Sequence, residues 1–164
     1  MTADGRELTW REMVRPEDAG AVRRIVSSTG FFSPEEIEIA VELVEERLAR
    51  GDGSGYHFIF AERGSRPVGY ACFGPIPATR FSWDLYWIAV DESDRGGGIG
   101  RLLLERSERI IARMGGRRIY AETSGRAQYE PTRAFYRACG YAEEAVLAEF
   151  YAPGDAKHFF VKEI

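Results

Sequence analysis

A cluster of glycines stands directly before an amphipathic run in DRGGGIGRLLLE, residues 94–105. The glycines are Gly96, Gly97, Gly98 and Gly100, with Arg95 and Arg101 at the ends of the cluster. The first turn of a helix presents backbone N–H groups without an intrahelical partner and carries a partial positive charge, which favours an anion such as phosphate. Glycine lets the backbone approach that anion closely. The segment predicts an anion-binding loop at a helix N terminus.

Two nucleotide-binding motifs do not fit this loop. The dinucleotide fingerprint GxGxxG needs a third small residue, but the frame from Gly96 ends on Arg101 and the frame from Gly98 ends on Leu103. A Walker loop needs Gly-Lys-Ser/Thr, whereas Gly100 precedes Arg101 and Leu102. A disordered RGG-type RNA segment is disfavoured because a strand pattern and a helix pattern enclose the loop. On these residues alone, a flexible connection that binds no ligand remains an alternative interpretation.

The elements that must position the loop follow from periodicity and from turn residues. Ser33, Pro34 and Glu36 match an N-cap, a first-turn proline and a capping-box carboxylate, and Gly51 stands where that helix should end. Two-residue alternation and β-branched or aromatic runs predict strands over 7–14, 56–63, 67–76, 81–90, 117–124, 141–152 and 156–164. Helical spacing predicts helices over 16–29, 33–51, 98–114 and 130–140.

This order of elements predicts an α/β fold, in which a mixed sheet of about seven strands is flanked by about four helices. The chain has 164 residues, 45% of them hydrophobic, and contains no repeat, low-complexity tract or linker. We expect a single domain over residues 1–164.

Composition narrows the classes of partner. The net charge of −4 gives no overall positive field for DNA or RNA, so we expect no nucleic-acid partner. The N terminus lacks a signal-peptide pattern and no apolar run is long enough to span a membrane, so we expect a cytoplasmic protein with no membrane partner. Cys72 and Cys139 are interpreted as small hydrophobic residues of a reducing compartment. His57 and His158 lack ligand spacing, and no metal site is expected.

Two motifs carry a resemblance to a known family. The segment LYWIAVDESDRGGGIGRLLLE, residues 85–105, contains Arg95-x-x-Gly98-x-Gly100 between a strand pattern and a helix pattern. It resembles the GNAT acyltransferase superfamily, whose signature is (Q/R)xxGx(G/A) in that setting. TRAFYRACGY, residues 132–141, resembles the family's second motif, AxxFYxxxGF. The order of elements is similar over nearly the whole chain, which implies a GNAT-like acyl-CoA N-acyltransferase fold.

The resemblance implies acetyl-CoA (coenzyme A) as co-substrate and no metal. Backbone groups of Ile88, Ala89 and Val90 would pair with the pantetheine arm, and the loop from Arg95 through Gly96, Gly97, Gly98, Ile99 and Gly100 to Arg101 would cradle the pyrophosphate. Arg101 either contacts phosphate or is a solvated helix residue. Many relatives carry an asparagine where this chain has Tyr129. That departure moves the local pantetheine contact to Tyr129, Gln128 or Thr132.

Amine acetylation needs an unprotonated amine and a proton for the leaving thiolate. Tyr136 matches the position of the general acid in many relatives and is assigned that role. Glu122 matches the base position of ribosomal-protein alanine acetyltransferases, and Asp84 lies on the strand where other relatives place a carboxylate. The base is therefore Glu122, Asp84 or neither, with a water relay open to both carboxylates.

The leading hypothesis is an N-acetyltransferase that moves the acetyl group to a primary amine of a small molecule or peptide by direct attack in a ternary complex. The rivals are a catalytically silent acyl-CoA-binding module and an unrelated α/β binding protein. A homodimer is left open. Candidates for contact with the acceptor come from aromatic and acidic residues of the loops. The aromatic candidates are Phe31, Phe32, Phe81, Trp83, Phe150 and Tyr151, and the acidic ones are Glu35, Glu36, Glu149 and Asp155.

Overall fold

The computed structural model describes residues 5–164, and its elements follow the predicted order. The strands are β1 (Leu8–Arg11), β2 (His57–Arg63), β3 (Arg66–Pro75), β4 (Ser82–Val90), β5 (Arg118–Ser124), β6 (Ala142–Ala152) and β7 (Asp155–Glu163). The α-helices are α1 (Asp18–Ser28), α2 (Pro34–Arg50), α3 (Ile99–Arg113) and α4 (Glu130–Ala138). Three short 3-10 helices, η1 (Gly51–Ser54), η2 (Glu92–Asp94) and η3 (Ala127–Tyr129), were not predicted.

The strands are hydrogen-bonded in the order β1-β2-β3-β4-β5-β7-β6. The β4–β5 pair is parallel, whereas β1–β2, β2–β3, β5–β7 and β6–β7 are antiparallel. The predicted mixed α/β sheet of seven strands with four α-helices is therefore confirmed. The chain divides into two compact units, one of residues up to Gly74 together with Trp87–Arg109, the other of Pro75–Tyr86 together with Ile110–Ile164.

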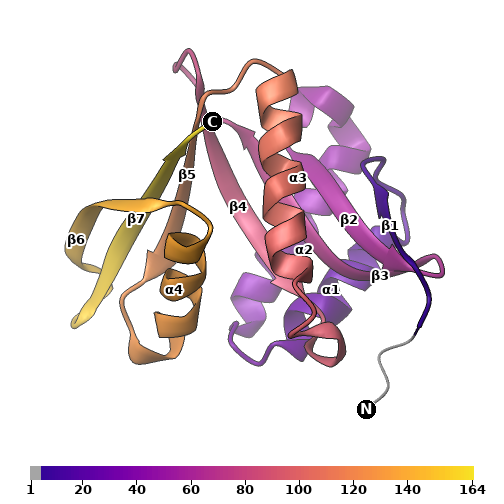
Figure 1. Cartoon of the computed structure of the whole chain (residues 1–164), viewed down its shortest axis with the longest axis horizontal. Helices are drawn as coiled ribbons and strands as arrows, with labels where there is room; N and C mark the ends of the chain where they lie inside the picture. The colour runs from indigo at the N-terminus through magenta and orange to yellow at the C-terminus, as the bar shows by residue number, and fades with distance from the viewer. Residues whose placement is uncertain (1–4) are drawn as a thin grey trace. The chain divides into compact units, whose positions relative to one another are not determined.

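In the first unit, α1 and α2 lie on one side of β2 and β3 (Figure 1). The predicted cap of α2 is present, because Ser33 Oγ accepts a hydrogen bond from Glu36 N at 3.2 Å and Pro34 occupies the first turn. Alternate residues of β2 and β3 face these helices and form one buried apolar cluster. Its members are Val22, Ile25, Val26, Ala40, Val41, Val44, Phe58, Phe60, Tyr70, Cys72 and Ala89.

Strand β1 is shorter than the alternating pattern predicts. Its pairing with β2 runs from Leu8↔Arg63 to Arg11↔Phe60. The Arg11 guanidinium then turns to an ion pair with Asp18, at 2.8 Å between Nη1 and Oδ2, and donates to the Met13 carbonyl. Beyond Arg11, these side-chain bonds take the place of further backbone pairing with β2.

In the second unit, α4 packs on β7 through Tyr136, whose ring lies 5.6 Å from that of Phe160 between centroids. Strands β6 and β7 form a long hairpin that turns at Gly154, where φ is +77°. The β6–β7 register slips between Leu147 and Ala152, where Glu149 has a φ of +56°. The slip is a bulge in β6, a feature that the alternating sequence pattern does not reveal.

In the part of the chain from residue 5 onward, no helix combines the length and the apolar character needed to cross a membrane.

Candidate active site

The glycine loop, residues 95–101, joins β4 to α3 in the first unit. Gly96 and Gly98 have φ values of +82° and +79°, a conformation that side chains with a Cβ rarely adopt. A Cβ at either position would meet nothing within 4 Å, so backbone conformation, and not space, requires glycine here. Leu102 N donates to Gly98 O at 3.2 Å, which places the N–H groups of Ile99 and Gly100 in the first turn of α3. The loop thus offers helix N-terminal donors with open space above the glycines.

A capped turn holds the entrance of the glycine loop. Asp91 Oδ1 accepts from Ser93 N at 3.1 Å and from Ser93 Oγ at 2.8 Å, which fixes η2. Burial opposes ionisation of Asp91, but these bonds and the positive charges of Arg66 and Arg24 outweigh it and lower the pKa of Asp91. Asp91 N also donates to Val68 O at 2.7 Å. The loop is therefore tied to β3 and to α1 before the first glycine.

The two arginines of the loop have partners on the surface. Arg95 Nη1 lies 3.3 Å from Glu92 Oε2, and its guanidinium lies 5.5 Å from the ring centroid of Phe31. Arg101 Nε lies 3.8 Å from Glu105 Oε1, and both side chains are about half exposed. Both guanidinium groups are therefore held by exposed acidic partners, which an anion could compete with at little cost.

Gly69 on β3 is a residue that sequence reasoning missed. A Cβ there would lie 3.1 Å from Leu103 Cδ1, 3.2 Å from Ala89 O and 3.4 Å from Ile99 Cγ2. The glycine therefore lets the first turns of α3 approach β3 and β4, which sets the position of the loop. A glycine inside a strand pattern is a known sign of such close approach and could have identified it.

The predicted pantetheine residues form the last part of β4, directly before Asp91 and the glycine loop. Ala89 is buried in the apolar cluster, whereas Ile88 and Val90 are half-buried. Their proposed contacts use backbone groups, so the packing of the side chains is compatible with that role.

In the second unit, the two candidate carboxylates lie on one face of the sheet. The parallel pairing runs from Ser82↔Arg118 to Leu85↔Ala121, so Asp84 pairs with Tyr120 and Glu122 follows directly after the last paired residue of β5. Positions 120 and 122 share a face because strand side chains alternate. Half-burial, together with the negative charge of Glu122, raises the pKa of Asp84 to about 6, and Lys157 opposes this rise. The sequence indicated both carboxylates as candidate bases, but it did not predict that they lie close together.

Lys157 is the second residue that the sequence did not indicate. Its Nζ lies 2.6 Å from Glu122 Oε2, and the lysine side chain is only 13% exposed. Glu122 is therefore an ion-paired carboxylate at the same face as Asp84.

Tyr136 lies on the other face of the same strands. Phe160 pairs with Ala121, which alternates with Glu122, and the Tyr136 ring stacks on Phe160 and also contacts Tyr141. Burial, with a smaller effect of Cys139, raises the pKa of the Tyr136 phenol, which is therefore protonated at neutral pH. The structure places the predicted acid and the predicted bases on opposite faces of β5.

The segment before α4 contains the remaining coenzyme candidates. Thr132 and Tyr129 are half-buried, and Gln128 is exposed. Arg133, which is buried, donates from Nη1 to Ser124 O at 2.7 Å and to Arg126 O at 3.0 Å. This arginine fixes the long connection between β5 and α4, and sequence reasoning did not single it out.

Several acceptor candidates have contacts within the fold. Trp83 is buried beneath Gly116, and buried Asp155 pairs with Arg126 at 3.2 Å. Phe150 and Tyr151 are about half exposed on β6. In the described residues 5–164, no group of three or more His, Cys, Asp and Glu side chains is placed to hold a metal ion.

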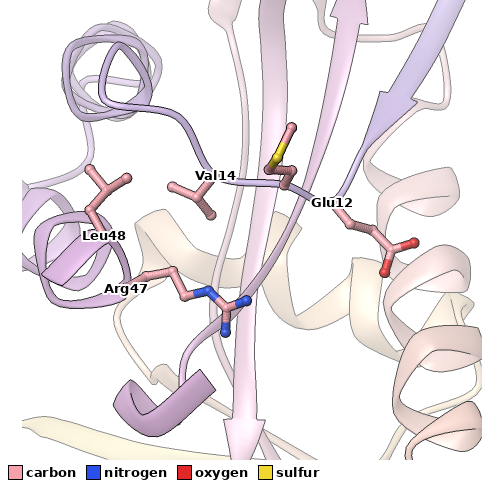
Figure 2. Close-up of a pocket in the computed structure, with 5 residues that line it drawn as sticks. Glu12, Val14, Arg47 and Leu48 are labelled. Carbon is pink, nitrogen blue, oxygen red and sulfur yellow. The ribbon is translucent and has the colours of Figure 1, made fainter. Parts of the chain in front are cut away.

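An open pocket of about 350 Å³ lies elsewhere on the first unit, between the chain after β1 and the C-terminal part of α2 (Figure 2). Glu12, Met13, Val14, Arg47 and Leu48 line it. Arg47 is engaged there with Asp52 at 2.9 Å and with Tyr56 O at 3.2 Å. None of the predicted site residues lines this pocket, so it is not part of the candidate active site.

Comparison with known proteins gives a family match and many similar structures. The model of the acetyltransferase (GNAT) family matches residues 21–141, which is most of the chain. A protein from Desulfovibrio desulfuricans, described as a candidate acetyltransferase of the GNAT family, is 48% identical with a TM-score of 0.95, over 96% of this chain and 99% of that one. A comparison with curated proteins gives no match.

More distant structures share the fold. An aminoglycoside 6'-N-acetyltransferase complexed with coenzyme A is 19% identical, with a TM-score of 0.74 over 96% of each chain. The ribosomal-protein-S18-alanine N-acetyltransferase from Escherichia coli is 20% identical, with a TM-score of 0.73 over 96% of this chain and 94% of that one. These similarities confirm the predicted GNAT-like fold.

Proposed function

The chain belongs to the acetyltransferase (GNAT) family, and from that premise we propose that it transfers the acetyl group of acetyl-CoA to a primary amine of a small molecule or peptide. The observation that carries the proposal is the glycine loop. Its left-handed Gly96 and Gly98 open the first turn of α3 to an anion, and coenzyme A presents a pyrophosphate. The family match and the coenzyme A complex of a relative support this choice of anion.

The coenzyme contacts are assigned in two groups. Backbone N–H groups from Gly96 to Arg101 would bind the pyrophosphate, with Arg95 and Arg101 adding charge. Backbone groups of Ile88, Ala89 and Val90, with Tyr129 or Thr132, would hold the pantetheine arm. Acetyl-CoA itself would supply the activated thioester.

Acetyl transfer then requires two proton movements. The amine nitrogen attacks the thioester carbon, so that a C–N bond forms, the C–S bond breaks and the amine loses a proton. A carboxylate of the Asp84 and Glu122 pair accepts that proton, directly or through one water, and Tyr136 donates a proton to the thiolate.

The surroundings of the carboxylates favour a cationic acceptor. Asp84 and Glu122 contribute negative charge, and Phe150 and Tyr151 offer half-exposed rings on β6. An amine that arrives protonated would be attracted by the carboxylates before it loses its proton. The relatives named for an aminoglycoside and for an alanine of a ribosomal protein are consistent with a small-molecule or a peptide acceptor.

A screen of amines, amino acids and N-terminal peptides for acetyl-CoA-dependent thiol release tests the proposal. We expect release with at least one amine and a large loss of rate in Tyr136→Phe. Binding of acetyl-CoA without release for any acceptor would support a silent acyl-CoA-binding module instead. Absence of acetyl-CoA binding in calorimetry would contradict both functions.

A further inference from the structure

Lysine 157 stands out by residue type and by burial. The chain contains 20 arginines and two lysines, Lys157 and Lys162, both on β7. Arginine supplies the positive charge of the other ion pairs described above, such as those of Asp18, Glu92, Glu105 and Asp155. Lys157 is nevertheless mostly buried and lies 2.6 Å from Glu122 Oε2. Burial of an ammonium group is costly unless a negative partner compensates, so the buried position of Lys157 depends on its ion pair with Glu122.

Two aromatic rings also contact the ammonium group of Lys157. Its Nζ lies 4.2 Å from the ring centroid of Phe150 and 5.0 Å from that of Phe159. Phe159 is the register partner of Glu122, and Phe150 belongs to the bulge of β6. Cation–π contacts of this length are attractive, most of all where water is partly excluded. Lys157 is thus held in one place by a carboxylate and two rings.

We propose that Lys157 is a positioning residue, which keeps Glu122 in an ion pair and thereby makes Asp84 the carboxylate that accepts the proton of the attacking amine. The inference rests on the proposed acetyl transfer and deepens it by dividing the roles of the two carboxylates. Chemically, the amine N–H bond breaks, its proton passes to Asp84 directly or through one water, and Lys157 remains protonated throughout.

The charges on this face support the division. Asp84 faces Glu122 and Tyr120 from β5, Lys157 from β7 and, two residues along its own strand, Tyr86. Arg118 lies beyond Tyr120, donating to its hydroxyl at 3.3 Å, and is paired with Glu144 and Glu163. Half-burial and the charge of Glu122 raise the pKa of Asp84 to about 6, so Asp84 is ionised at neutral pH and is a stronger base than an ordinary carboxylate. Protonation of Glu122 would instead break its contact with Lys157.

The pH dependence of kcat/KM separates this role from a structural ion pair. In Lys157→Met, the acidic limb should move to higher pH by about one unit, because a neighbouring positive charge no longer favours ionised Asp84. Lys157→Arg should restore the wild-type limb. Glu122→Gln should lower kcat less than Asp84→Asn does and should move the limb to lower pH, because a negative neighbour of Asp84 is lost. Asp84→Asn should lose at least about 100-fold in kcat.

Lys162→Met is the matched control, because Lys162 lies on the same strand but on the other face, where its Nζ donates to Cys139 O at 3.0 Å. Its acidic limb should match that of the wild type. Circular dichroism and thermal unfolding verify that each variant is folded. A folded Lys157→Met enzyme with an unchanged limb would overturn the inference. Loss of activity in Glu122→Gln with retention in Asp84→Asn would overturn it as well.

A second measurement does not depend on turnover. With two lysines in the chain, isotope-labelled lysine gives two side-chain NMR signals, and Lys162 serves as the internal reference. The Lys157 signal should titrate with a midpoint near pH 6 in the wild type and lose that step in Asp84→Asn. A Lys157 signal without this step overturns the coupling to Asp84. If the step is present but no amine supports thiol release, the proposed function fails, and the proton-accepting role of Asp84 fails with it.

Discussion

Replacing Gly98 by alanine separates the conformation of the glycine loop from its binding role. The Cβ would meet nothing within 4 Å, so no clash contributes, and the cost comes from φ = +79° alone. A left-handed alanine costs about 1 kcal/mol, which for a chain of this size lowers Tm by roughly 2–4 °C. The free energy of acetyl-CoA binding should fall by more than the free energy of unfolding. A displaced backbone donor to a charged phosphate costs about 1.5–3 kcal/mol, which corresponds to roughly a 10- to 150-fold rise in Kd.

Gly55→Ala is the matched control for that experiment. Gly55 has a φ of +75°, with nothing within 4 Å of a built Cβ, and it follows η1 at the C-terminal end of α2. It should show the same loss of Tm with an unchanged Kd. Calorimetric titration with acetyl-CoA and thermal unfolding measure the two effects. Equal affinity of Gly98→Ala and Gly55→Ala for acetyl-CoA would refute the assignment of the loop.

Three further substitutions test other parts of the account. Tyr136→Phe should lower kcat by about 100-fold or more while the Kd for acetyl-CoA, measured by calorimetry, stays near the wild-type value; an unchanged kcat would remove Tyr136 as the acid. Gly69→Ala should cost about 1–3 kcal/mol in urea unfolding, because its Cβ would press on Leu103, Ala89 and Ile99, and a neutral effect would show that α3 can move away freely. Asp84→Asn should stabilise the protein at pH 7 by about 1–2 kcal/mol, a value reduced for the half-exposed position of Asp84, and by much less at pH 4. The sign follows because the pKa of Asp84 is raised from 3.8 to about 6 in the folded state, so folding favours the protonated carboxyl and this group's contribution declines as pH rises through that window. Destabilisation by Asp84→Asn at pH 7 would contradict the raised pKa.

The order of the elements was accessible from the sequence because periodicity and capping residues are local properties. Ser33, Pro34 and Glu36 predicted the start of α2, and Gly96 and Gly98 predicted the turn into α3. The 3-10 helices escaped prediction because each consists of only three or four residues. The β6 bulge escaped because it depends on the register between two strands.

The candidate site was predictable only in part, for a similar reason. The resemblance indicated Tyr136, Glu122 and Asp84, and their roles stay predictions. The proximity of Glu122 to Lys157 depends on the register of β5 with β7, which residue spacing along one strand does not determine. Likewise, Arg133 supports the β5–α4 connection by donating to two backbone carbonyls. Every residue has such a carbonyl, so the sequence does not distinguish the two that accept these bonds.

The most direct test of the proposed function follows the acetyl group itself. Acetyl-CoA labelled in the acetyl group is incubated with the protein and the best amine from the screen, and both the free thiol and the labelled amide are quantified. The account predicts one labelled amide for each thiol released, with both strongly reduced in Tyr136→Phe. Thiol release without a labelled amide, or neither product for any amine, would contradict it.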